Sequence, residues 1–119
     1  MNPVQVYEET GVTTQNNGRL VVMMYEGAIK FLKQALAAIE TGDFEAKGRS
    51  INRAKDIIFE LNTVLDMEAG GEISRNLRKL YNFMWQQLSQ ANAQCDSKGI
   101  GEIISLLEEL NQGWKAISA

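Results

Sequence analysis

The sequence predicts an all-α fold: an antiparallel up-down four-helix bundle preceded by a short helical or extended N-terminal strap. Apolar residues recur at helical spacing in four segments, and no segment shows the alternation of a strand. The single proline lies at position 3, so none interrupts the later segments. With 119 residues, of which 45% are hydrophobic and 23% charged, the composition is that of one globular domain. We expect one domain over 1–119, with the strap at 1–16 and the bundle at 17–118.

Glycines divide the bundle into its helices. Gly42 is expected to end the first helix and Asp43 to cap the second. The glycine pair at 70–71 makes the next break, and the last follows position 95, with Asp96 or Ser97 as the cap of the final helix. These breaks predict four helices, over residues 17–41, 43–68, 72–95 and 98–117. The joints are short, so neighbouring helices should run antiparallel.

The first 16 residues differ in composition from the rest. Asn2-Pro3 is a suitable helix start. The following stretch "TGVTTQNN" is rich in Thr and Asn, and we interpret it as a break in any helix. The segment is expected to form a short turn or helix followed by an extended polar strap, with isolated apolar residues at Val4, Val6, Tyr7 and Val12.

Each predicted helix carries an apolar stripe of the kind that packs a bundle interior. The predicted core lines are Leu20, Met24, Ala28, Phe31 and Ala35; Ile51, Ala54, Ile58, Leu61 and Leu65; Ile73, Leu77, Leu80, Met84, Leu88, Ala91 and Cys95; and Ile103, Leu107, Leu110, Trp114 and Ile117.

The first helix has more apolar residues than one stripe needs. Val22, Ile29 and Leu36 recur every seven residues beside the core line, and Tyr25 lies next to them. The apolar arc is about 200° wide, where about 100° would suffice. The other helices extend this surplus with Ile57, Val64, Tyr81, Trp85 and Leu106.

Three interpretations of the surplus remain open from the residues alone. The side chains could pack against neighbouring helices, because corner positions touch two neighbours. They could be buried in a homodimer. They could also form an apolar groove for a helix of another chain, because large apolar patches usually mark interaction sites.

The composition argues against several functional classes. There is no histidine, which removes the commonest general base and metal ligand. We therefore predict no enzyme, no cofactor and no metal site. Cys95 falls on a core line and is interpreted as an inert buried thiol. A net charge of −3 without a basic patch argues against a nucleic-acid partner. The absence of a signal sequence and of a membrane-length apolar run predicts a cytoplasmic protein.

Several stretches together resemble the FliS family of flagellin export chaperones. The most specific are "GGEISRNLRKLYNFM" at 70–84, "MMYEGAI" at 23–29, and the ending from Trp114 to Ser118. Tyr7, followed by Val12 and Thr13, is similar to the family's N-terminal pattern. The resemblance covers about residues 7–118.

The resemblance implies a helical bundle that binds the disordered C-terminal segment of flagellin in the bacterial cytosol. Such a chaperone prevents premature polymerisation and assists delivery to the flagellar type III secretion apparatus, whose export gate is a further expected partner. It implies that the strap occupies part of the flagellin site. The protein is then a monomer or weak homodimer; a module for a different helical partner, or an obligate homodimer, is the alternative. The predicted groove and strap residues are Tyr7, Val12, Val22, Tyr25, Ile29, Leu36, Ile57, Val64, Tyr81, Trp85 and Leu106.

Overall fold

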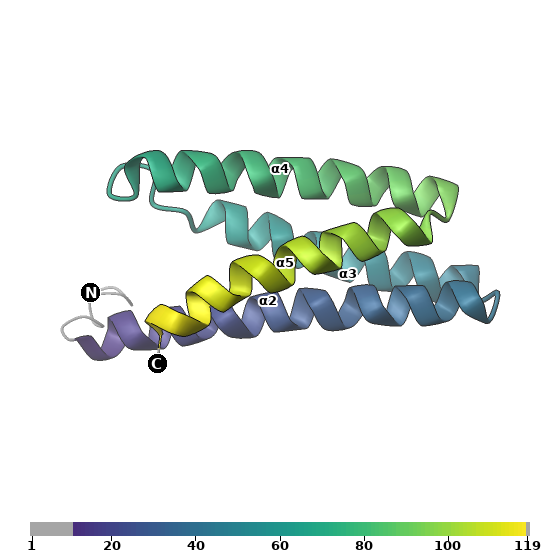
Figure 1. Cartoon of the computed structure of the whole chain (residues 1–119), viewed down its shortest axis with the longest axis horizontal. Coiled ribbons are helices and arrows are strands. Elements are labelled where there is room, and N and C mark those ends of the chain that lie inside the picture. Colours follow the sequence, from purple (N-terminus) through teal and green to yellow (C-terminus); the bar gives the residue numbers. More distant parts are fainter. Residues whose placement is uncertain (1–10, 119) are drawn as a thin grey trace.

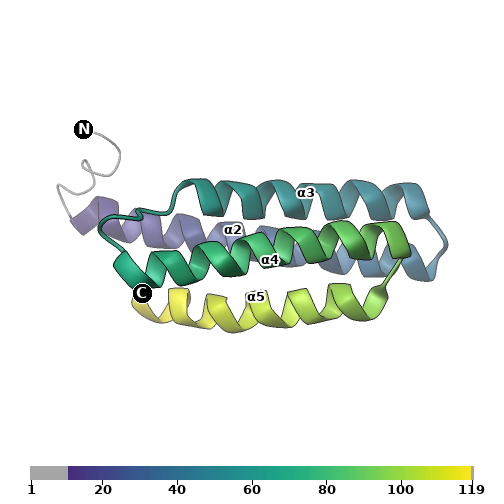
Figure 2. The same cartoon turned by 90° about the horizontal axis from the view of Figure 1, so that it is seen from above.

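Four helices pack side by side in a computed structural model that describes the backbone of residues 11–118 and the side chains of residues 18–118 (Figures 1 and 2). They are α2 (Gly11–Glu40), α3 (Phe44–Thr63), α4 (Gly71–Gln94) and α5 (Ser97–Ile117). Helix α2 contacts α3 and α5, and α4 contacts the same two helices. The chain therefore forms an elongated up-down bundle in which sequence neighbours are antiparallel, as predicted.

Side-chain caps fix two of the helix starts that the sequence indicated. Asp43 accepts a hydrogen bond from the backbone N–H of Ala46, at 3.1 Å, and so caps α3. Asp96 accepts one from the N–H of Gly99, at 3.0 Å, and caps α5. Each carboxylate satisfies an N–H group that has no partner within its own helix.

Two helix boundaries differ from the prediction. Helix α2 begins at Gly11, so residues 11–16 of the predicted strap are helical. Extending a formed helix through Thr and Asn costs little per residue, whereas nucleating one there would be unfavourable. Helix α3 ends at Thr63 instead of residue 68. Beyond it, the Asp66 side chain accepts hydrogen bonds from the N–H groups of Glu68 and Ala69, an arrangement that competes with helix continuation.

The core is formed by the predicted stripes in their central parts. Ala28, Ile51, Met84 and Leu107 are fully buried and come from the four different helices. The outer ends of the stripes are exposed, contrary to the prediction: Leu20 is 53%, Ile73 70% and Ile117 75% exposed. Leu80, Leu110 and Trp114 are only partly buried.

The prediction of a buried Cys95 is wrong. Cys95 follows the last helical residue of α4 in a left-handed conformation (φ 52°) and is exposed. Beside it, the buried side chain of Lys47 donates from Nζ to the Asn92 carbonyl oxygen at 2.7 Å. This cation satisfies a carbonyl at the C-terminal end of α4, where the helix dipole favours positive charge.

Two tyrosines join α2 to α4 through the core. The hydroxyl oxygens of Tyr25 and Tyr81 lie 2.7 Å apart in a buried hydrogen bond. Desolvation by burial raises the pKa of both phenols above 10. Both residues were predicted to contact a partner in the groove, but their side chains lie in the core, because Tyr25 is 0% and Tyr81 1% exposed.

These raised pKa values make stability depend on alkaline pH. Each phenol ionises more readily in the unfolded chain, so its stabilising contribution is complete below pH 10 and is lost as pH rises above 10. We expect the free energy of unfolding to fall by up to about 1.4 kcal/mol per pH unit for each buried tyrosine. Urea unfolding from pH 8 to 11.5 measures this. The Tyr25→Phe/Tyr81→Phe variant should show a distinctly shallower fall, and an equal fall in both proteins would contradict the prediction.

Among residues 11–118, no helix is both long enough and apolar enough to cross a membrane.

Candidate partner-binding groove between α4 and α5

Helices α4 and α5 separate along their length. They are joined by the short turn at Cys95 and Asp96, and they diverge toward the end of α5 (Figure 1). At that end α5 leans on α2: Ser118 approaches Gly18 so closely that a Cβ on this glycine would lie 3.0 Å from the Ser118 Cβ. The Trp114 ring also packs on Tyr25, with 6.3 Å between ring centroids. The first turns of α4 are thus left without a neighbour on the α5 side.

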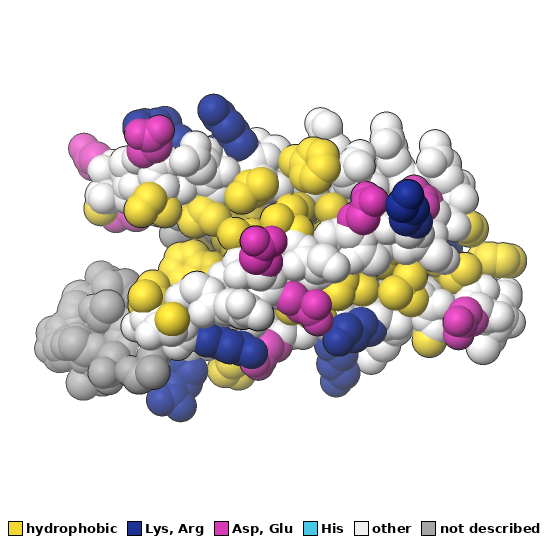
Figure 3. Space-filling model, viewed as in Figure 1, with side chains coloured by type: hydrophobic (Ala, Val, Ile, Leu, Met, Phe, Trp, Pro, Cys, Tyr) yellow, Lys and Arg dark blue, Asp and Glu magenta, His cyan; other side chains and the backbone are white. Residues whose placement is uncertain are grey.

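The separation opens a cavity of about 360 Å³ at this end of the bundle. Its walls come from all four helices and from the turn between α3 and α4. It is lined by Val21, Leu61, Val64, Leu65, Asp66, Ala69, Gly70, Ile73, Ser74, Leu77, Tyr81 and Trp114. Val64 is 58% and Ile73 70% exposed, which is unusual for large aliphatic side chains that share one cavity. Figure 3 shows hydrophobic side chains gathered between α4 and α5.

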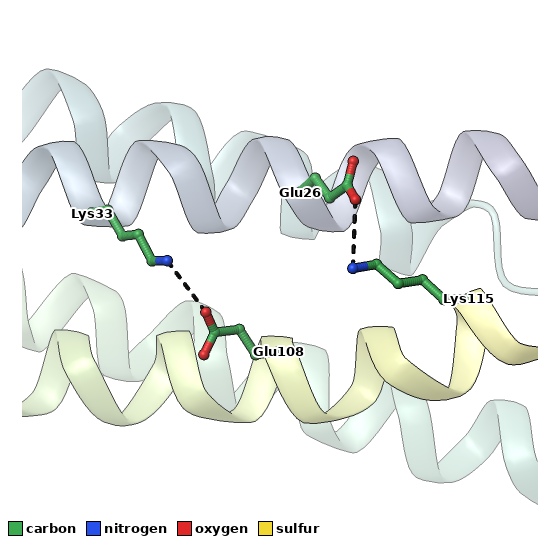
Figure 4. Close-up of polar contacts among 4 residues, drawn as sticks. All are labelled: Glu26, Lys33, Glu108 and Lys115. Atoms are coloured by element: carbon green, nitrogen blue, oxygen red, sulfur yellow. Dashed lines mark ion pairs between the residues drawn. The ribbon is translucent and has the colours of Figure 1, made fainter.

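An apolar stripe of α5 continues this cavity along the helix. Glu108 and Lys115 form ion pairs with α2 (Figure 4), so the opposite side of α5 faces α4. Leu106, Leu110 and Ile117 occupy that side at spacings of four and seven residues. From Leu106 to Ile117 the stripe spans about 16 Å, or three helical turns. We call the cavity together with this stripe the α4/α5 groove; its length and apolar lining suit an amphipathic helix.

The structure distributes the predicted site residues over several surfaces. Val64 and Leu106 belong to the α4/α5 groove, and the buried Tyr81 forms part of the inner wall of its cavity. Ile29, Leu36 and Ile57 are partly buried and pack against the core, as the first alternative interpretation expected. Val22 is also half-buried. Tyr7 and the side chain of Val12 lie outside the described residues, and their strap role stays a prediction.

The surplus stripe of α2 faces α5 instead of forming a continuous apolar surface. Ile29 lies in a cavity of about 730 Å³ between these helices, where charged and amide side chains predominate. Lys33 Nζ lies 3.4 Å from Glu108 Oε2, and Lys115 Nζ lies 3.7 Å from Glu26 Oε2 (Figure 4). These ion pairs connect α2 to α5 on both sides of Ile29, so charged side chains border this cavity.

Trp85 lies on a different side of the bundle, between α3 and α4. It lines another cavity of about 360 Å³ with Phe59, which is 63% exposed, and the Lys55 Nζ lies 4.0 Å from the indole ring centroid. The predicted residues therefore do not form one site. Sequence reasoning missed Ile73, Leu110, Trp114 and Ile117, because they continue core lines without a break in spacing. Their positions near helix ends are the one signal in the sequence that could have distinguished them from buried core residues.

Comparison with known proteins gives a consistent set of relatives. The whole chain, residues 1–119, matches the family described as flagellar protein FliS. It is 39% identical over 115 residues to the flagellar secretion chaperone FliS of Salmonella typhimurium, covering 96% of this chain and 85% of the relative. The corresponding protein of Vibrio cholerae is 36% identical over 118 residues (96% and 87%). That of Bacillus subtilis is 33% identical over 114 residues (96% and 84%).

Proposed function

Because the chain belongs to the FliS family of flagellar secretion chaperones, and not to a family of enzymes, we propose that it binds the C-terminal segment of flagellin in the α4/α5 groove. Binding takes place in the cytoplasm, prevents premature polymerisation and assists delivery to the type III secretion apparatus, including its export gate. The observation that carries this proposal is the apolar groove left open where α4 and α5 diverge, beside the packed core.

The physical requirement for such a chaperone is an apolar surface that substitutes for the filament. Flagellin's terminal segments are amphipathic helices that would expose apolar faces and self-associate when alone. A groove lined by Ile73, Leu110, Trp114 and Ile117 offers side chains of matching character. Folding of the segment on binding consumes part of the interaction free energy, so a large interface is needed.

The remaining predicted contacts extend this proposal beyond the groove. A segment that wraps the bundle would reach the surface between α3 and α4, where Trp85 and Phe59 are exposed. Tyr7 and Val12 of the predicted strap would compete with flagellin for part of the site.

Calorimetric titration with a flagellin C-terminal fragment tests the proposal. We expect a 1:1 complex, a large negative heat-capacity change because two apolar surfaces leave water, and altered fluorescence of Trp114 in the groove. A heat-capacity change near zero, or no binding at micromolar concentration, would contradict it. Sedimentation of the free protein under the same conditions should give a monomer or a weakly associating dimer. A tight dimer unable to bind the fragment would instead support the homodimer interpretation.

A further inference from the structure

An acidic ridge runs along the outer edge of the α4/α5 groove. Glu102 and Glu109 lie seven residues apart on α5, and Leu106 of the groove lies between them, four residues after the first and three before the second. This spacing places both carboxylates beside the apolar stripe on one side of the helix. Both residues are exposed, and no ion pair joins either of them to another described residue.

Two of the other three charged residues of α5 pair with α2, and the third, Lys98, lies four residues before Glu102 and forms no ion pair with a described residue. Glu108 pairs with Lys33 and Lys115 pairs with Glu26, so the charges on the α2 side of α5 are compensated within the bundle (Figure 4). The two carboxylates of the ridge therefore differ from Glu108 in lacking a cation from the bundle.

The α4 side of the groove carries no compensating charge. Ile73 and Leu80 define the groove-facing line of α4, and the positions three residues after each are Asn76 and Phe83. At the open end, the charged side chain that lines the cavity is Asp66, which is also acidic. An apolar groove with acidic borders is complementary to a helix whose apolar stripe is flanked by Lys or Arg.

Building on the proposed function, we propose that the Glu102–Glu109 ridge selects a cationic flank on the bound flagellin segment. Lysine or arginine side chains spaced about two turns apart on the segment would lie against the two carboxylates while its apolar face fills the groove. Because the borders of the groove differ, with acids along α5 and neutral side chains along α4, one orientation of the segment is favoured over the reverse.

Charge reversal tests the ridge. The variant Glu102→Lys/Glu109→Lys should bind the flagellin C-terminal fragment on the order of tenfold more weakly than the wild type at low ionic strength. Raising the salt concentration to about 0.5 M should shrink the difference to threefold or less, because exposed charges are screened. Titration of both proteins at the two salt concentrations provides the measurement, and circular dichroism verifies that the bundle is folded.

A matched control distinguishes the effect of the ridge on binding from the effect of the protein's net charge. Asp56→Lys/Glu60→Lys makes the same change in net charge on exposed residues of α3, which does not contact α5. We expect this control to bind within about twofold of wild type. Equal binding by ridge and control variants, with a wild type that binds, would overturn the ridge proposal and leave the groove intact. Failure of the wild type itself to bind would overturn the proposed function.

A reciprocal change on the fragment gives an independent readout. Each Lys or Arg of the fragment is replaced singly by Glu, and binding to wild type and to Glu102→Lys/Glu109→Lys is compared. A fragment variant that loses affinity for the wild type and regains it with the reversed ridge supports the proposal. If no replacement shows this exchange, the ridge does not contact a cation of the segment.

Discussion

Replacing Ile73 and Ile117 together with asparagine should reduce flagellin-fragment binding by about 100-fold or more while the bundle stays folded. Both side chains are more than two-thirds exposed, so the free protein loses little buried apolar area, and surface changes usually cost within about 0.5 kcal/mol each. In the complex the variant loses two aliphatic contacts and buries two amides against an apolar helix. The sum of these costs exceeds about 2.7 kcal/mol, which corresponds to 100-fold.

Asparagine is chosen because it leaves the charge around the groove unchanged. The control variant Met23→Asn/Phe44→Asn makes a comparable change at exposed apolar residues outside the groove, 59% and 55% exposed. Its affinity for the fragment should stay close to that of the wild type. If the control weakens binding as much as the groove variant, exposed apolar area in general, and not the α4/α5 groove, governs the interaction.

Replacing Leu107 with aspartate should unfold the bundle. Leu107 lies on the same helix as the groove stripe, but it is 0% exposed in the centre of the core. A carboxylate there has no partner and costs several kcal/mol, whereas small domains are stable by about 5–15 kcal/mol in total. Far-ultraviolet circular dichroism and thermal melting measure the outcome.

The neighbouring Ser105→Asp variant serves as the control for this experiment. Ser105 is exposed, so the same charge on the same helix should stay hydrated and change stability by less than about 1 kcal/mol. A cooperative melt of Leu107→Asp close to that of wild type would show that α5 is not anchored through Leu107. Together with the Ile73 and Ile117 variant, this pair separates residues that build the bundle from those that bind a partner.

Most residues of the candidate site could not be identified from the sequence. Leu107 and Ile117 belong to one periodic stripe on α5, and Ile73 and Leu88 to one stripe on α4, yet one member of each pair is buried and the other exposed. Periodicity reports which side of a helix faces inward, but it does not report how far along the helix a neighbour follows. Tyr25 and Tyr81 show the converse error: their positions beside the core lines were interpreted as part of a partner surface, whereas each hydroxyl is the other's hydrogen-bond partner inside the core.

The four helices, their caps at Asp43 and Asp96 and the inward face of each helix could be predicted from the sequence, because they depend on local spacing and local hydrogen bonding; the family could be predicted from its motifs. Where the bundle stays closed and where it opens depends instead on packing between helices. The turn at Cys95 and Asp96 holds α4 and α5 together at one end, while close packing of Ser118 on Gly18 draws α5 toward α2 at the other. That divergence depends on contacts between residues about 100 positions apart, and it converts the ends of two core stripes into a groove.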